Sequence, residues 1–196
     1  MTWQARPMTL VVGGVVPPDD VVGRLREANE VLATLPQAGA VLVGDRRHGK
    51  TSLSRLVQRS AAAAGDLVVA VSAERESYED FVIALAAELA RLDPGWAREL
   101  AKWRLTLTAG PVKLERAAQA ASALDELLHR AVDRAGGRRL TLFIDEVTIL
   151  ARNLERQNPG SGDSFLHLLR RFRQQYAGRL AIVLSGSIGF HHVSLD

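Results

Sequence analysis

The segment Gly44-Asp45-Arg46-Arg47-His48-Gly49-Lys50-Thr51 decides how this chain folds. It matches the pattern G-x-x-x-x-G-K-[ST], in which main-chain N–H groups surround a phosphate. A short apolar run at 40–43 precedes the segment, and a helical pattern at 51–64 follows it. Because the motif works where a strand turns into a helix, the flanking sequence supports the match. We therefore expect a phosphate-binding loop at this position.

Each fixed position of the loop has a physical role. Glycines let the backbone curl so that successive N–H groups share one concavity, and the positive end of the following helix dipole faces it. Lys50 is expected to reach the β- and γ-phosphates, and Thr51 to offer its hydroxyl to Mg²⁺. A plain glycine-rich turn is the alternative, but it has no use for lysine and threonine at these places. The expected ligands are ATP and Mg²⁺, and the expected contacts are Gly44, Asp45, Arg46, Arg47, His48, Gly49, Lys50, Thr51 and Ser52.

Three further apolar runs resemble the one before the loop. They lie at 67–71, 140–144 and 180–184, and helical patterns occupy 21–35, 51–64, 81–92, 117–135 and 165–176. Runs that are apolar on both faces belong in the middle of a parallel sheet that helices cover. Alternating strands and helices therefore predict an α/β fold, a P-loop NTPase whose parallel β-sheet is sandwiched by helices.

Two adjacent acids, Asp145 and Glu146, follow the third run. The carboxyl ends of strands in an open parallel sheet face the ligand crevice. Asp145 is therefore expected to hold Mg²⁺, directly or through water. Glu146 is expected to orient or deprotonate the attacking water. In the alternative interpretation both acids only cap the next helix, and the complete phosphate loop upstream favours the functional one.

The fourth run ends in Leu184-Ser185-Gly186-Ser187. A hydroxyl at this end of the strand could contact the γ-phosphate or the attacking water. Ser187 is the favoured candidate, and Ser185 is its rival. A turn of small residues explains the pattern nearly as well.

Composition bounds the class of protein. The chain has 196 residues, of which 47% are hydrophobic and 24% charged, which suits one globular domain over 1–196 with a lead-in at 1–20. Cysteine is absent, which excludes disulfides and thiolate chemistry. Neither a secretory signal nor an apolar run of roughly 20 residues is present, so we expect a cytoplasmic protein without a membrane partner. The net charge of +3 is small and dispersed, so nucleic acid is not indicated as a partner.

Taken together, these segments resemble the archaeal-type AAA ATPases, close to the STAND signalling NTPases. The resemblance rests on Gly13–Pro18, Val22-Gly23-Arg24-x-x-Glu27, the phosphate loop, Phe143–Glu146 and Leu184–Gly189. It implies that Val22 and Gly23 lie against the adenine with Arg24 nearby. It also implies that Asp145 and Glu146 form the metal-and-water pair, and that Ser187 occupies the first sensor position.

The resemblance implies an ATP-binding and ATP-hydrolysing switch domain of a signalling or regulatory ATPase, with Glu146, Lys50 and Ser187 as catalytic residues. A DNA-handling ATPase, such as an initiator or transposition regulator, is one alternative. An interaction module that binds ATP without turnover is another. A transition-state arginine from a neighbouring subunit is also expected, and the candidates are Arg152, Arg170, Arg171, Arg173 and Arg179.

Family members carry a fifth core strand and then a helical lid, whereas this sequence stops shortly after the fourth run. We therefore expect an AAA-like core with the lid absent, which would make the chain a fragment. The strand before the phosphate loop would then lie at the sheet edge, where a partner protein or a second copy would cover it. A fifth strand supplied by residues 9–12 would count against that expectation.

Overall fold

The fold was obtained as a computed structural model that describes residues 21, 23–37, 39–44, 48–75, 77–96, 98, 101 and 113–186. Segments 1–20 and 187–196 lie outside the described residues, and with them the candidate fifth strand at 9–12 and Ser187. Val22 and the three residues Asp45, Arg46 and Arg47 lie outside as well.

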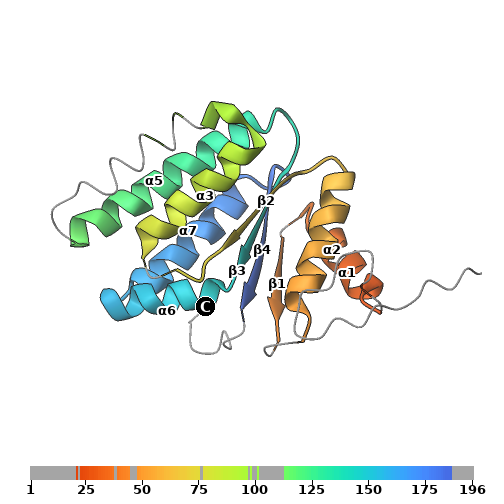
Figure 1. Ribbon diagram of the computed structural model, residues 1–196, viewed down its shortest axis with the longest axis horizontal. Helices are drawn as coiled ribbons and strands as arrows, with labels where there is room; N and C mark the ends of the chain where they lie inside the picture. The colour runs from red at the N-terminus through yellow and green to blue at the C-terminus, as the bar shows by residue number, and fades with distance from the viewer. Residues whose placement is uncertain are drawn as a thin grey trace, which may run out of the picture.

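Four parallel strands form one sheet, as the apolar runs predict. They are β1 (Gly39–Val43), β2 (Leu67–Ser72), β3 (Leu140–Asp145) and β4 (Leu180–Gly186), in the spatial order β1-β4-β3-β2 (Figure 1). The two central strands are buried along nearly their whole length, which explains why both carry apolar residues on both faces of the sheet. Among the described strands β1 pairs with β4 alone, so the strand that leads into the phosphate loop lies at the sheet edge, as expected.

Strand β1 begins at Gly39, one residue before the apolar run that predicts it. Gly39 has φ 115°, and a Cβ atom at this position would lie 2.1 Å from the carbonyl oxygen of Ile182 on β4. Only glycine therefore allows the backbone of β1 to approach β4 this closely.

Helices cover both faces of the sheet. Helices α1 (Leu25–Thr34) and α2 (Lys50–Ala63) lie on one face, and α3 (Tyr78–Leu92), α5 (Lys113–Arg134), α6 (Val147–Gln157) and α7 (Ser161–Gln175) lie on the other (Figure 1). A short 3₁₀ helix, Pro94–Trp96, follows α3. The α/β prediction, with a parallel sheet between helical layers, is therefore confirmed.

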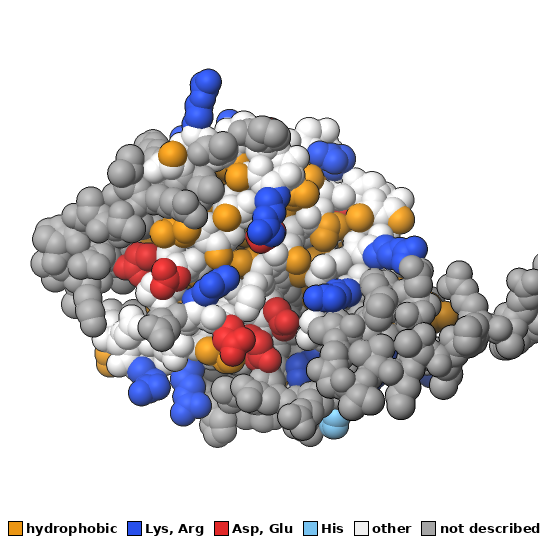
Figure 2. All heavy atoms as spheres, viewed as in Figure 1, with side chains coloured by type: hydrophobic (Ala, Val, Ile, Leu, Met, Phe, Trp, Pro, Cys, Tyr) orange, Lys and Arg blue, Asp and Glu red, His pale blue; other side chains and the backbone are white. Residues whose placement is uncertain are grey.

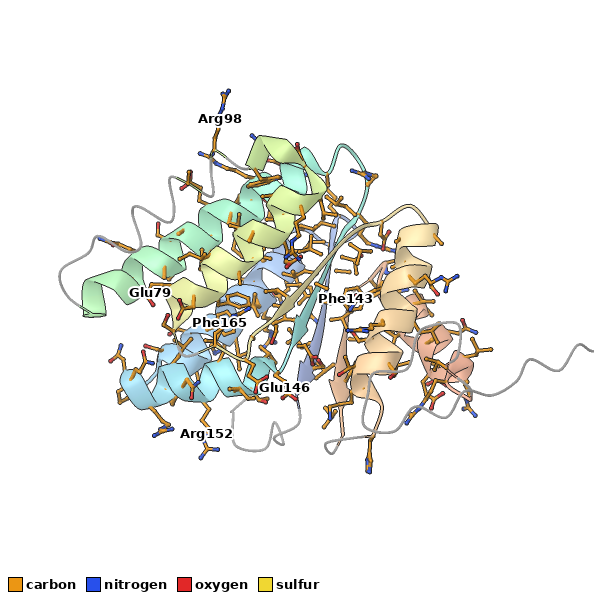
Figure 3. The ribbon with its side chains drawn as sticks, viewed as in Figure 1. Glu79, Arg98, Phe143, Glu146, Arg152 and Phe165 are labelled. Atoms are coloured by element: carbon orange, nitrogen blue, oxygen red, sulfur yellow. The ribbon has the colours of Figure 1, made fainter. Side chains whose placement is uncertain are left out.

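Alternation along the central strands divides the core in two. Phe143, Ala181 and Val183 face α1 and α2, whereas the residues between them face the four-helix layer. In that larger layer Phe165 makes edge-to-face contacts with Phe81 and Tyr78 at 5.4 Å (Figure 3). Asp145 and Ser185 continue the same alternation, so both face the layer that contains α2, the helix after the phosphate loop.

Helix α6 was not predicted from the sequence. Its buried residues Val147, Leu150, Ala151 and Leu154 recur at helical spacing, which is a clear amphipathic pattern. The five helices that were predicted are all present, and their ends differ from the predictions by a few residues. The starts of α1, α5 and α7 each differ by four residues, and α1 begins at Leu25 instead of residue 21, after Gly23 with φ 80°.

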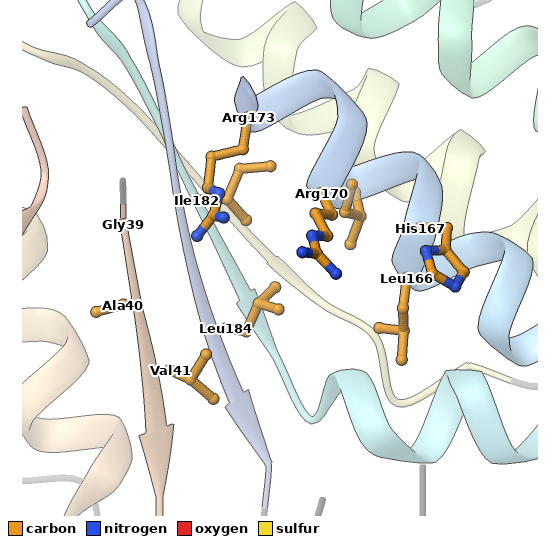
Figure 4. A pocket seen from close by; sticks show the side chains of 10 residues that line it. Gly39, Ala40, Val41, Leu166, His167, Arg170, Arg173, Ile182 and Leu184 are labelled. Carbon is orange, nitrogen blue, oxygen red and sulfur yellow. The ribbon is translucent and has the colours of Figure 1, made fainter. Parts of the chain in front are cut away.

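An apolar groove runs between the edge strand and α7 (Figure 4). Its floor consists of Gly39, Ala40, Val41, Leu166, Leu169, Ile182 and Leu184, and its rim carries His167, Arg170 and Arg173. Val41 and Val43 of β1 are 50% and 58% exposed. We call this feature the β1–α7 groove.

Candidate functional site

The loop between β1 and α2 has the backbone that the glycine positions predict, in the part that is described. Gly44 follows directly after β1, and Gly49 precedes α2 with φ 75° and ψ 19°. This is the left-handed region, which glycine adopts without the steric penalty that a Cβ brings. The strand, loop and helix therefore occur in the predicted order, and the amino end of the 14-residue helix α2 opens onto the loop.

The ammonium group of Lys50 turns back across the mouth of this loop. Its Nζ donates a hydrogen bond to the carbonyl oxygen of Gly44, six residues earlier. The half-buried side chain thus holds a positive charge at the point where the strand ends and the loop begins. A phosphate oxygen placed in the loop would offer this ammonium a stronger, charged acceptor than a carbonyl.

Arg24 ties the start of α1 to the loop. Its Nη2 donates to the carbonyl oxygen of His48 at 2.8 Å, and its Nη1 lies 3.1 Å from Oε1 of Glu27. The resemblance placed Arg24 near the adenine, and the structure brings it against the loop backbone itself. Gly23 beside it has φ 80°, with open space where a side chain would lie. This contact between residues 24 apart is one that sequence reasoning missed.

A surface groove joins these parts. It is lined by Arg24 just before α1, by Glu27, Glu30 and Val31 of α1, by Val41, Leu42 and Val43 of β1, and by Gly44, His48, Gly49, Lys50 and Leu53. The lining thus combines apolar side chains of α1, β1 and α2 with the charged Lys50 of the loop. A flat heteroaromatic ring against the apolar side chains could therefore extend a phosphate chain towards Lys50. We call this feature the loop groove.

The acid pair lies at the end of β3. Oδ1 of Asp145 accepts a hydrogen bond from the main-chain N–H of Glu146 at 3.0 Å and another from the hydroxyl of Ser185. Glu146 has φ 54° and ψ 37°, and among the described residues it is the only residue other than glycine with positive φ. Such strained residues concentrate at functional sites. Both acids are partly exposed, so both can meet water or a ligand.

The acid pair also lies where a helix begins, as the alternative interpretation expects. Glu146 is the residue that precedes the first turn of α6, and its carbonyl accepts from the N–H of Ile149 at 3.0 Å. Its side chain makes no capping hydrogen bond to that helix. The position in the chain is therefore that of a helix start, while the carboxylate itself is not used as a cap.

The order of the strands places the loop and the acid pair at the same end of the sheet, where the carboxyl ends of the strands lie. Val43 of β1 is level with Gly186 of β4, and Ile144 of β3 is level with Leu184. Neighbouring strands lie about 4.8 Å apart, so the ends of β1 and β3, with β4 between them, lie roughly 10 Å apart. A hydrated cation together with phosphate oxygens is of the size that bridges this gap.

The donor set suits magnesium held jointly with a phosphate. In the described part of the chain, no group of three or more His, Asp and Glu side chains gathers to bind a metal alone. Mg²⁺ typically uses one or two carboxylates plus substrate phosphates and water. Asp145 and the hydroxyl of Thr51 fit that pattern.

Comparison with known proteins supports the fold. No protein-family model matches the chain, and no curated protein does. A solved structure that it resembles is the ORC2 protein of Aeropyrum pernix in ADPNP–ADP complexes, with a TM-score of 0.50 and 20% sequence identity. The match covers 90% of this chain and 44% of that protein, so this chain spans less than half of its length. At this identity the likeness concerns the fold.

Proposed function

We propose that this domain binds ATP with Mg²⁺ at residues 44–52 and hydrolyses it slowly, as the switch of a larger regulatory ATPase of the AAA and STAND type. The observation that carries the proposal is the complete G-x-x-x-x-G-K-T loop between β1 and α2, with Lys50 folded over its mouth. The fold likeness to a protein solved with ADPNP and ADP supports a nucleotide as the ligand.

Binding would exchange one partner of Lys50 for another. The ammonium leaves the carbonyl of Gly44 and bonds the β- and γ-phosphates, while loop N–H groups bond the phosphate oxygens. The adenine lies in the loop groove beside Gly23 and Arg24, and Val22, outside the described residues, remains a proposed contact. Magnesium neutralises phosphate charge, and Thr51 and Asp145 are the residues that would hold it.

Hydrolysis would use the acid pair and the end of β4. Glu146 orients a water molecule and accepts its proton as the water attacks the γ-phosphorus. The bond between that phosphorus and the β,γ-bridging oxygen breaks, which yields ADP and phosphate. Ser187, outside the described residues, remains the proposed contact to the γ-phosphate. Arg152 extends outwards from α6 (Figure 3), which supports it as the candidate that reaches a nucleotide on a neighbouring molecule.

Neither alternative function gains a specific observation. Among the described residues, the lysine and arginine side chains on the face shown in Figure 2 are spread out and form no continuous stripe that would follow a nucleic-acid backbone. The helices of the described residues include none with both the length and the apolar character needed to cross a bilayer.

The β1–α7 groove is where a partner would cover the open sheet edge. Edge strands with exposed apolar side chains tend to pair with a further strand. Arg170 and Arg173 on the rim favour a partner strand with acidic side chains, and they disfavour a second copy, which brings the same charges. A peptide of alternating valine and glutamate should therefore bind, and one of alternating valine and lysine should not. Self-association with no preference between the peptides would contradict this.

Nucleotide binding tests the main proposal. Lys50→Ala should abolish ATP binding in isothermal titration calorimetry, because the loop loses the ammonium group that would bond the β- and γ-phosphates. Lys113→Ala, which removes a lysine from the start of α5, is the matched control and should bind as the wild type does. Equal affinity for all three proteins would contradict the phosphate-loop assignment.

A further inference from the structure

Ser185 is a buried hydroxyl beside the acid pair. It lies next to the last residue of β4, its side chain is 3% exposed, and it faces the same side of the sheet as Asp145. A buried hydroxyl without a partner destabilises the fold, so its hydrogen bond has structural weight. That bond is donated to Oδ1 of Asp145 on the neighbouring strand.

Within the described part of the chain, the hydrogen bonds to the carboxylate of Asp145 fall on one oxygen. Oδ1 accepts from the hydroxyl of Ser185 and from the N–H of Glu146, which uses the two acceptor directions of that atom. The two donors come from different segments, one from β4 and one from the start of α6. Together they fix the plane of the carboxylate and leave Oδ2 as the oxygen with acceptor capacity for a cation or its water.

We propose that Ser185 is a positioning residue that holds the carboxylate of Asp145 in the orientation that receives Mg²⁺ with the nucleotide. This role differs from direct contact with the γ-phosphate, the role considered for Ser185 on sequence grounds. The inference rests on the proposed function, and it specifies how the metal half of that site is built. Residues that orient metal ligands in this way typically contribute roughly 10–100-fold to metal affinity or activity.

Thr141 provides a matched control. It lies on β3 at the opposite end of the sheet, is fully buried, and donates its hydroxyl to a carboxylate, Oδ2 of Asp66, at 2.7 Å. Thr141→Val therefore removes the same kind of buried strand-to-aspartate hydrogen bond away from the site. Any effect that comes only from lost stability should appear in this variant as well.

The experiment compares wild type, Ser185→Ala, Ser185→Thr and Thr141→Val in two titrations. The first measures ADP affinity in EDTA, and the second measures the Mg²⁺ concentration that gives the half-maximal change in ATP affinity in calorimetry. We expect Ser185→Ala to leave the first unchanged and to raise the second by roughly 10–100-fold. Ser185→Thr keeps the hydroxyl, so its Mg²⁺ dependence should be that of the wild type. Thr141→Val should match the wild type in both titrations.

The outcomes separate the two claims. A folded Ser185→Ala protein with a wild-type Mg²⁺ dependence would overturn the positioning role and leave the proposed function standing. Wild-type protein that binds neither ADP nor ATP, with or without Mg²⁺, would overturn the proposed function, and the positioning role with it. If Ser185→Ala does not fold, Ser185→Cys keeps the volume with a weaker donor and should give the same direction of change. An unchanged Mg²⁺ dependence in that variant would also overturn the proposal.

Discussion

Replacing Glu146 with asparagine tests the strain in the backbone of this residue separately from the role of its carboxylate. Glu146 adopts φ 54° and ψ 37°. An ordinary L-residue is less stable in this left-handed region by about 1–2 kcal/mol, and asparagine tolerates it better. Because the substitution relieves part of that penalty, we expect Glu146→Asn to stabilise the fold by about 1 kcal/mol. In a chain of this size that gain raises the melting temperature by about 2–4 °C.

Glu146→Gln is the matched control, because glutamine keeps the length of the side chain and disfavours the left-handed region as glutamate does. Both variants lose the carboxylate, so both should bind ATP and fail to hydrolyse it. Thermal unfolding without nucleotide gives the stabilities, and phosphate release gives the turnover. If asparagine melts no higher than glutamine at this position, the backbone of Glu146 is not strained. If Glu146→Gln hydrolyses ATP at the wild-type rate, Glu146 does not act on the water.

Three further changes test other parts of the structure. Arg24→Ala should weaken ATP binding about tenfold in calorimetry, because a charged donor to a loop carbonyl is lost, whereas Arg26→Ala, on the exposed side of α1, should not. Thr148→Val should raise the melting temperature, because the buried hydroxyl of Thr148 has no hydrogen-bond partner within the described part of the chain; a lower melting temperature would show that it has one. Burial, and next the negative charge of Asp125, raise the pKa of the Tyr78 phenol. Tyrosine in the unfolded chain ionises at about pH 10. The stability that the protonated phenol of Tyr78 contributes is therefore full below that pH and is lost as the pH rises above it. Urea unfolding at rising alkaline pH should show a smaller loss in Tyr78→Phe than in wild type, and equal losses would contradict the assignment.

Local sequence carried most of the fold. The continuous apolar runs identified all four strands because β3 and β4 are buried on both faces and the others are short strands beside them. Ser77 is a residue type that commonly caps helices, and its hydroxyl oxygen accepts the N–H of Asp80 at 3.1 Å at the start of α3. The sequence analysis assigned no residue range to helix α6, because Asp145 and Glu146 were interpreted as functional residues at the end of the strand. The apolar spacing after them is nevertheless helical.

The candidate site was predictable in its parts and not in its contacts. The loop, the acid pair and the end of β4 were each found from residue types. The bonds from Ser185 to Asp145 and from Arg24 to His48 join residues 40 and 24 positions apart. Such contacts depend on strand order, on register and on where α1 begins, and none of these is written in a local pattern.

A structure determined with an ATP analogue and Mg²⁺ tests the central claim most directly. The account predicts phosphates within hydrogen-bonding distance of the N–H groups of residues 44–52. It also predicts that the Lys50 ammonium moves from the carbonyl of Gly44 to the β- and γ-phosphate oxygens. Lys50 still bonded to Gly44, with the nucleotide bound elsewhere or not at all, would contradict it.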